Sequence, residues 1–548
     1  LNDTNGVLLP NQKDITLPLT DELEIEAIEA EKESVNTAKI RIEFNNPDNL
    51  DITGISIENM DVTIDRIITQ NQKSYVNITA VPNRYYDSYK IQEVTYIING
   101  NTQKKELEGK VEIQFYKELY NYEDWQSIEI GTYQNYRLMN DIDFSGKTDI
   151  KTNVTMGRLE AEGEMKFLKN IDLELEKSNS GLIKQINYGL KNIGFDQIVI
   201  QNKTTGNYYG MIVNNLAETE RINFTNMQIK DSENITGTYR GIIANNTGKV
   251  NGLFIENIII DCKRSEQVGV FGSTRGKIEN ITMNHIKCYG STYLGGLIGY
   301  GTNTSGTFNV KAEDIHIISK SGNYVGAIAG KIDIGSSKGI ELKEAEVTGN
   351  DNIGGIFGYG CGVDMTIDQV KVEGNNSVGG VIGNFKDGAD GYTITIRNSN
   401  ISGSGSNIGG VGGTGSDFGG SSIIIENCTI KGTSTQSDNV GGIFGNWIGT
   451  KNNVVIRNSE IKSLGNQVGG LFGYMNRSDG RSSANYIAEN LKIEGNSYVG
   501  GLIGTLKAGT IYNISMNGSI VGTGHSIGGF VGYLDNTDMT AAVNKSSI

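Results

Sequence analysis

The chain has 548 residues, of which 73 are Gly, only 4 are Pro and 37% are hydrophobic. This length allows two or more domains, and the abundance of small and polar residues favours many short strands and turns over helices or disorder. The 48 basic residues are outnumbered by 63 acidic ones, and the resulting net charge of −15 argues against nucleic acid as a partner. No apolar stretch approaches 18 residues, which argues against membrane insertion.

Residues 1–116 contain short runs that alternate apolar and polar side chains, such as AKIRIEFNN (38–46) and KVEIQFYK (110–117). Asn, Asp and Gly turns separate these runs, and no long repeat relates them. The pattern predicts a compact antiparallel β-sandwich of the immunoglobulin-like kind over 1–116.

Residues 117–150 lack both patterns. We expect a short helical or irregular turn around Trp125, which would cap and lead into the domain that follows. The cap is needed because an exposed parallel strand edge recruits other strands.

From residue 151 to 548 the chain repeats a glycine motif about every 29 residues, with VGGIFG at 440–445 as an example. In eight clear copies the first glycine of the motif is Gly295, Gly354, Gly379, Gly409, Gly441, Gly469, Gly500 or Gly528. An alternating segment with an Asn bend, such as IIIENCTIKG (423–432), precedes each motif. Three short strands per repeat predict an all-β fold, a right-handed parallel β-helix of about 13 or more coils, which we expect to be cut short at its C-terminal end.

The glycines have a mechanical role in this prediction. At a tight corner, Gly permits a positive φ and leaves room for the coils on either side. A phosphate-binding loop needs only one such turn, followed by a helix. The recurrent Asn residues favour either a stacked amide ladder or a simple turn preference, and they are Asn257, Asn280, Asn398, Asn427, Asn458 and Asn490.

The motif VGGLFG (468–473), with its preceding I-x-N strand, resembles the glycine-rich GLUG repeat. The stretch YQNYRLMNDIDFSG (133–146) is similar to the lead-in of such repeats in immunoglobulin-A-specific zinc metallopeptidases of Gram-positive bacteria. Related repeats occur in bacterial surface adhesins. The resemblance covers about 115–548 and implies a secreted or wall-attached extracellular protein, whose partners would be a host protein or glycan and downstream domains of the same polypeptide.

Catalytic signatures are missing from the sequence. A zinc peptidase of that family needs an HExxH helix, but the chain has only His285, His316 and His525, none in that context. If the intact protein is a peptidase, its active site lies beyond residue 548. Polysaccharide hydrolysis needs two carboxylates at a set separation, and no Asp-Asp pair occurs. We therefore expect no catalytic residue, metal or cofactor here.

Two smaller patterns follow from counting back from the glycines. His285, His316 and Glu344 each lie ten residues before a first glycine, but the outer two would stand roughly 9–10 Å apart, too far for one ion. Cys262 and Cys288 share another register, which allows either a disulfide or two buried thiols. Cys361 and Cys428 have no such match.

The longest insertions follow the glycine strand, so they would gather along one edge of the β-helix. Exposed aromatic and polar side chains there would suit glycan stacking or protein anchoring. The candidate binding residues are Phe385, Asp387, Asp417, Phe418, Trp447, Arg477 and Arg481. The alternative is that these loops are only solvated connections.

Three functional hypotheses remain. The first is a non-catalytic extracellular stalk, substrate-positioning or host-binding region of a large bacterial surface protein, which the resemblance extends to a zinc metallopeptidase. The second is a stand-alone adhesin for glycan or host protein. The third, which the missing acid pair disfavours, is a polysaccharide-degrading enzyme.

Overall fold

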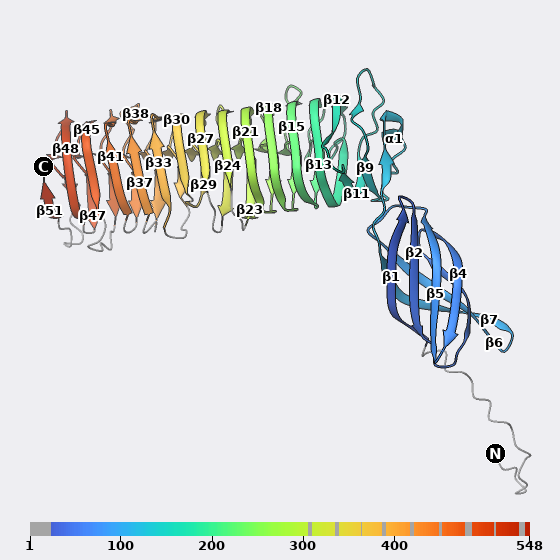
Figure 1. Cartoon of the computed structure of the whole chain (residues 1–548). Helices are drawn as coiled ribbons and strands as arrows, with labels where there is room; N and C mark the ends of the chain where they lie inside the picture. Colours follow the sequence, from blue (N-terminus) through green and yellow to red (C-terminus); the bar gives the residue numbers. More distant parts are fainter. Residues whose placement is uncertain are drawn as a thin grey trace, which may run out of the picture. The chain divides into compact units, whose positions relative to one another are not determined.

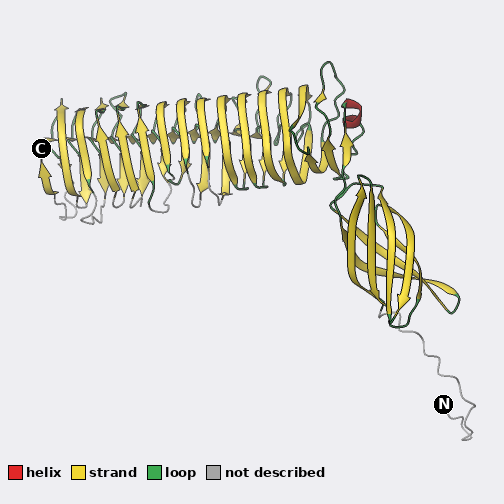
Figure 2. Ribbon diagram, viewed as in Figure 1, coloured by secondary structure: helices red, strands yellow, loops and turns green. Residues whose placement is uncertain are grey.

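The computed structural model describes residues 23–304, 309–334, 339–362, 364–385, 391–416, 421–448, 452–476, 485–508, 511–535 and 543–547. They form two compact units. The first extends to Glu118 and includes Gln134–Arg137, and the second contains Leu119–Tyr133 and everything from Leu138 onward. Figure 2 shows how completely strands dominate both units, and α1 (Tyr122–Gln126) is the only helix in the described ranges.

The first unit is an antiparallel β-sandwich. Its strands are β1 (Glu24–Ser34), β2 (Thr37–Asn45), β3 (Asp51–Ile57), β4 (Met60–Gln70), β5 (Lys73–Pro82), β6 (Ser88–Ile98) and β7 (Asn101–Glu112). One sheet has the order β1-β2-β5-β4 and the other β3-β6-β7. With strands lettered in chain order, this is the ABED and CFG arrangement of constant-type immunoglobulin domains.

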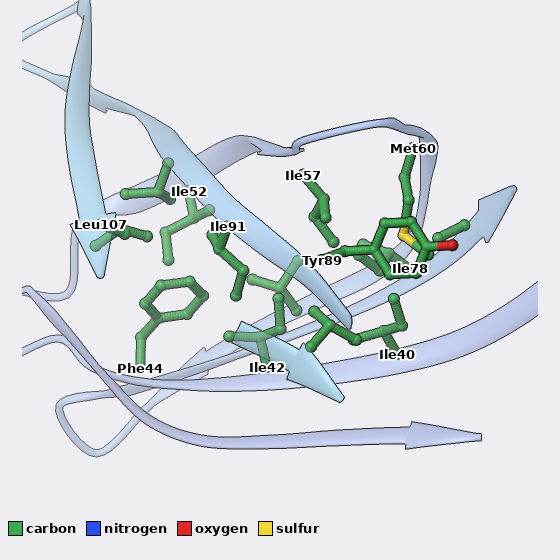
Figure 3. Close-up of a cluster of buried hydrophobic side chains, with 14 of the residues drawn as sticks. Ile40, Ile42, Phe44, Ile52, Ile57, Met60, Ile78, Tyr89, Ile91 and Leu107 are labelled. Carbon is green, nitrogen blue, oxygen red and sulfur yellow. The ribbon is translucent and has the colours of Figure 1, made fainter. Parts of the chain in front are cut away.

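The core of the sandwich lies between the two sheets (Figure 3). Alternate residues of β2, namely Ile40, Ile42 and Phe44, are buried and pack with Ile91 and Leu107 of the opposite sheet. The period of two in the sequence therefore becomes one buried and one solvated face.

A tyrosine fixes the crossing from β5 to β6. The Tyr89 hydroxyl donates to the Arg84 carbonyl at 2.9 Å and accepts from the Tyr86 amide at 3.0 Å. This geometry matches the tyrosine corner of immunoglobulin-like domains, in which a Tyr near the start of the sixth strand bonds to backbone just upstream.

The predicted helical turn around Trp125 is present as α1. Asn121 caps the helix by accepting from the Asp124 amide at 3.0 Å. Trp125 is fully buried, donates from Nε1 to the Lys151 carbonyl at 3.1 Å and meets Phe144 edge to face at 5.7 Å. The aromatic pair thus covers the N-terminal end of the second unit.

The second unit is a parallel β-solenoid of about 12 turns. β8 (Lys117–Leu119) and β9 (Asn135–Leu138) have most of their residues in the first unit, and the first strands wholly within the second are β10 (Ile142–Asp143) and β11 (Val154–Glu160). The strands of the second unit form three stacked columns, and Figure 1 shows the successive coils side by side along the unit. At about 4.8 Å per coil, the stack is roughly 60 Å long.

The first column carries the long strands with the central bend. Its members are β12 (Lys166–Leu175), β13 (Ile183–Asn202), β15 (Glu218–Asp231), β18 (Val250–Asp261), β21 (Ile278–Tyr289), β24 (Val310–Ile318), β27 (Ile340–Thr348), β30 (Met365–Gly374), β33 (Thr393–Arg397) with β34 (Asn400–Gly403), β37 (Ser421–Glu426) with β38 (Thr429–Gly432), β41 (Asn452–Arg457) with β42 (Glu460–Ser463), β45 (Tyr486–Gly495), β48 (Ile511–Gly522) and β51 (Val543–Ser547). Where the side chains of these strands are described, apolar residues alternate inward, which builds the solenoid core.

The second column contains the short strands of the glycine motif. They are β16 (Thr238–Arg240), β19 (Glu266–Val268), β22 (Leu294–Gly295), β25 (Val325–Gly326), β28 (Ile353–Gly354), β31 (Val378–Gly379), β35 (Ile408–Gly409), β39 (Val440–Gly441), β43 (Val468–Gly469), β46 (Val499–Gly500) and β49 (Ile527–Gly528). Each first glycine from Gly295 to Gly528 pairs with the first glycine of the next coil. The predicted glycine column is confirmed.

The third column returns the chain to the next coil. It contains β14 (Ile212–Asn215), β17 (Ile243–Asn246), β20 (Phe271–Thr274), β23 (Ile298–Thr304), β26 (Ala329–Ile334), β29 (Phe357–Gly360), β32 (Ile382–Phe385), β36 (Gly412–Ser416), β40 (Phe444–Ile448), β44 (Phe472–Asn476), β47 (Ile503–Ala508) and β50 (Val531–Leu534).

The reason for the glycines differs from the one expected. The first glycines do not have a positive φ, and the left-handed residue stands two positions earlier, as Asn407 does with φ 64° before Gly409. A Cβ on Gly409 would instead lie 2.2 Å from the Gly412 carbonyl oxygen and 2.6 Å from that of Ile443. Close backbone approach within and between coils therefore excludes a side chain.

The amide ladder is only partly as predicted. A left-handed residue does occupy the central bend of the first column, and Asn427 donates to Asn398 at 3.3 Å while Asn490 donates to Asn458 at 2.9 Å. However, Asn280 belongs to a different bend. Between Asn257 and Asn398 the bend is formed by His285, Asp314, Glu344 and Gln369, all with a positive φ.

Candidate functional site

Two of the predicted binding residues are buried, which corrects the view of them as exposed anchors. Phe385 is 4% exposed and Trp447 is 2% exposed. Trp447 stacks on Phe444 at 4.4 Å, and Phe385 meets the same ring edge to face at 5.4 Å. Both continue the alternation of their strands beyond the expected strand end, so they face inward. Asp387, Asp417, Phe418, Arg477 and Arg481 lie outside the described residues.

The strand ends before and after the long insertions lie where the prediction of a common edge requires them. Each insertion joins the end of a third-column strand to the start of a first-column strand, for example Ile448 to Asn452. Those strand ends are stacked on their equivalents in neighbouring coils. The described strand ends on either side of these insertions therefore lie along one edge of the solenoid.

The histidine register is wrong. His285 aligns with Asp314 and Glu344, whereas His316 aligns with Lys287 and Glu346. The turn after β24 is longer than the turns after β21 and β27, so counting back from the glycines fails. In the parts of the chain that the structure describes, no group of three potential ligands could hold a metal ion.

The cysteine register is also wrong. Cys288 pairs with Ile260, while Cys262 lies in the turn after β18. All four cysteines are buried, and none forms a disulfide. Burial raises the pKa of the Cys262 and Cys288 thiols and that of Cys428 to about 11, which keeps them protonated and unreactive at neutral pH.

A surface that the sequence reading missed runs along the second and third columns, and we call it the amide–tyrosine face. Its first row consists of the left-handed corner residues: Tyr208, Tyr239, Gln267, Tyr293, Tyr324, Asn352, Ser377, Asn407, Asn439, Gln467, Tyr498 and Ser526. Its second row consists of outward residues of the third column: Gln185, Asn214, Asn245, Ser273, Tyr300, Lys331, Tyr359, Asn384, Thr414, Asn446, Tyr474, Thr505 and Tyr533.

Contacts between the two rows show that they form one surface. Tyr293 meets Tyr300 edge to face at 5.1 Å, and Tyr324 meets Tyr359 at 6.2 Å. Most of these side chains are half-buried. The result is a polar and aromatic strip that continues from coil to coil.

Four of the nine tyrosines in the two rows are stacked in pairs. Tyr208 and Tyr239 lie parallel at 4.2 Å, and Tyr293 and Tyr324 do so at 5.2 Å. The flat sides of these rings contact one another between coils, so the rings present their edges and hydroxyl groups to a ligand. Burial raises the pKa of Tyr208 and Tyr293, which keeps both hydroxyls as neutral donors at physiological pH.

Amides continue the strip where tyrosines end. Asn439 donates to Asn407 at 2.9 Å, and Asn384 donates to Asn352 at 3.4 Å. Some oxygens in this face are buried and have no hydrogen-bond partner among the described residues: Gln267 Oε1, Thr414 Oγ1, Asn439 Oδ1, Asn446 Oδ1 and Thr505 Oγ1. The face therefore contains hydrogen-bonding capacity that the described residues do not use.

The charge of this face contrasts with that of the first column. Lys331 is the only charged residue in the two rows. The first column instead carries ladders of ion pairs between coils, such as Lys343 with Glu313 at 2.6 Å and Lys462 with Glu494 at 2.6 Å. One face is therefore ionic, and the other presents uncharged donors, acceptors and rings.

Such a face has the composition of a recognition surface. Tyr, Asn and Ser supply rigid contact area and adaptable hydrogen bonds in antibody paratopes as well. A sequence signal existed, since the residue two positions before each first glycine is repeatedly Tyr or Asn. It is hard to notice because Gln and Ser also occur there.

The larger unit defines a parallel β-solenoid repeat protein, preceded in the chain by a sandwich of immunoglobulin topology. Among the described residues, no helix has the length and apolarity needed to cross a bilayer. No protein family, curated protein or solved structure matches the chain. The resemblance to GLUG repeats and to the metallopeptidases therefore stays a prediction.

Proposed function

We propose that the chain is a non-catalytic, extracellular binding and spacer region of a larger bacterial surface protein. In this proposal the solenoid binds a host glycan along the amide–tyrosine face. The observation that carries the proposal is the continuity of that face, which repeats uncharged donors, acceptors and rings in coil after coil. The proposed secretion and the link to a zinc metallopeptidase rest on the resemblance of the repeats.

The spacing of the coils favours a glycan over an extended peptide. Equivalent side chains recur at the strand spacing of about 4.8 Å, whereas a β-strand advances about 3.3 Å per residue and presents the same side about every 6.6 Å. A peptide along the solenoid axis would lose register after one or two coils. The length of one pyranose unit in an extended 1,4-linked chain is close to one coil spacing, so successive sugars meet equivalent groups.

The experiment measures binding of the full chain to immobilised glycans, comparing the wild type with the double variant Tyr293→Phe and Tyr324→Phe. These changes keep the stacked rings and remove two hydroxyl donors. We expect at least a tenfold loss of affinity, as each lost hydrogen bond in a binding site leaves a polar group unpaired. Tyr188→Phe is the matched control, because Tyr188 is 54% exposed and outside the face.

If the wild type binds no glycan, or if the double variant binds as well as the wild type, the proposed binding face is wrong. A stand-alone adhesin remains the second candidate, because a continuous face could act without any attached enzyme. The reading frame after residue 548 separates the two, since an HExxH motif there supports a role in positioning a substrate for a metallopeptidase.

A further inference from the structure

One charged side chain interrupts the amide–tyrosine face. Lys331 lies in β26, directly between Tyr300 of the preceding coil and Tyr359 of the following coil. Its Nζ stands 5.6 Å from the ring centre of Tyr300 and 4.9 Å from that of Tyr359. Two aromatic rings therefore hold the ammonium group in place from opposite sides.

No anionic side chain that the structure describes pairs with this ammonium group. The rings attract its positive charge but provide no carboxylate to accept its three N–H groups. By contrast, lysines of the first column pair with carboxylates of a neighbouring coil, as Lys343 does with Glu313 of the preceding coil.

We propose that Lys331 is the anion subsite of the glycan-binding face and that it pairs with an isolated carboxylate on a sugar. The inference rests on the proposed function and adds the class of ligand. A charge-assisted hydrogen bond to a carboxylate would use the N–H donors of Lys331, while Tyr293 and Tyr324 bond the neighbouring sugar hydroxyls.

Because the two rows contain one cation, the matching ligand carries few carboxylates. No second charged residue lies in either row, and the chain as a whole has a net charge of −15. A polymer with a carboxylate on every sugar would place most of its charges beside uncharged groups and be repelled by the rest of the protein. The fitting ligand is a mainly neutral glycan with sparse carboxylates, from either a sialic acid or an occasional uronic acid.

The test measures the affinity of the full chain for matched oligosaccharides. One contains a single glucuronate, the second is the same molecule with its carboxyl reduced to an alcohol, and the third contains a single terminal sialate. We expect the wild type to prefer a carboxylated form by about tenfold, the size of one charge-assisted hydrogen bond at a half-exposed site. Comparing the glucuronate and sialate forms identifies the source.

The variant Lys331→Gln should remove this preference by weakening only the binding of the carboxylated form, and Lys331→Arg should retain it. Lys311→Gln is the control, because Lys311 lies on the ionic face and pairs with Glu341 at 3.5 Å. Added salt should reduce the preference of the wild type, because it screens exposed charges.

Each outcome separates the inference from the proposed function. If the wild type binds the carboxylated and reduced forms equally, or if Lys331→Gln keeps the preference, the anion subsite is wrong while glycan binding stands. If it binds none of the oligosaccharides, the proposed function fails and the inference fails with it. Preferential binding of an oligoglutamate peptide would assign the subsite to an acidic protein and also overturn the inference.

Discussion

Substituting Gly409 by Ala tests why glycine occupies the corner of every coil. The added Cβ would lie 2.2 Å from the Gly412 oxygen, 2.6 Å from the Ile443 oxygen and 2.7 Å from the Phe444 Cα. All three atoms belong to backbone, and two of them belong to the next coil. No side-chain rotation can relieve such contacts, so two coils must move apart.

The cost follows from the extent of that movement. Overpacking a dense core costs about 1–3 kcal/mol when side chains can adjust, and a clash with fixed backbone lies at the upper end or beyond. We expect about 3 kcal/mol of local destabilisation. Amide hydrogen exchange measures this quantity directly, because local opening exposes amides such as that of Val411, which donates to Ile443 at 2.8 Å. Its exchange should accelerate by about a hundredfold.

The control variant is Asn407→Gly, at the left-handed position with φ 64°. It loses the hydrogen bond from Asn439 but relieves the conformational cost of a side chain at positive φ, so stability should change by less than about 1 kcal/mol. Amides in distant coils such as β18 should be unaffected by either variant, because each coil contacts only its neighbours. Normal exchange at Val411 in Gly409→Ala would refute the steric explanation.

Further predictions concern packing, thiols and pH. Trp447→Ala should cost about 3–5 kcal/mol through loss of a buried ring, whereas Ile448→Ala, at a side chain 44% exposed, should cost much less, and denaturant titration compares the two. Alkylation by iodoacetamide, followed by mass spectrometry, should leave Cys428 and the other thiols unmodified until the chain is denatured, and rapid native labelling would contradict their burial. Hydrogen bonds from Lys462 and Lys492 lower the pKa of Glu494 from 4.5 to about 2. The contribution of this carboxylate to stability should therefore be complete above pH 4.5 and be lost as the pH falls towards 2. Glu494→Gln should flatten that part of the curve of stability against pH, and an unchanged curve would show that the ion pairs contribute nothing.

The sequence predicts the solenoid well because one steric requirement recurs in every coil. A corner where backbones approach within contact distance accepts only glycine. The glycines of this column therefore recur in the sequence at a regular interval, which can be recognised without the structure. The left-handed position before it tolerates several residue types, such as Tyr293, Asn407 and Gln467, and therefore leaves no obvious motif. The amide–tyrosine face is built at that variable position, which is why it was missed.

Register errors have a similar physical cause. Turns of variable length separate the first and second columns, so counting from the glycines misplaced His316 and Cys288 by two residues. Counting along the apolar alternation of the strands would have aligned them, since inward residues must stack on inward residues. The same alternation, followed to the end of β40, would have placed Trp447 inside.

The central claim, that ligand binds along the amide–tyrosine face, is tested most directly by covalent footprinting of the full chain with and without a saturating glycan. The account predicts that ligand slows the modification of Tyr293, Tyr324 and Lys331, while Lys311 on the ionic face reacts at an unchanged rate. Protection of Lys311 with none at Lys331 or the two tyrosines would contradict it.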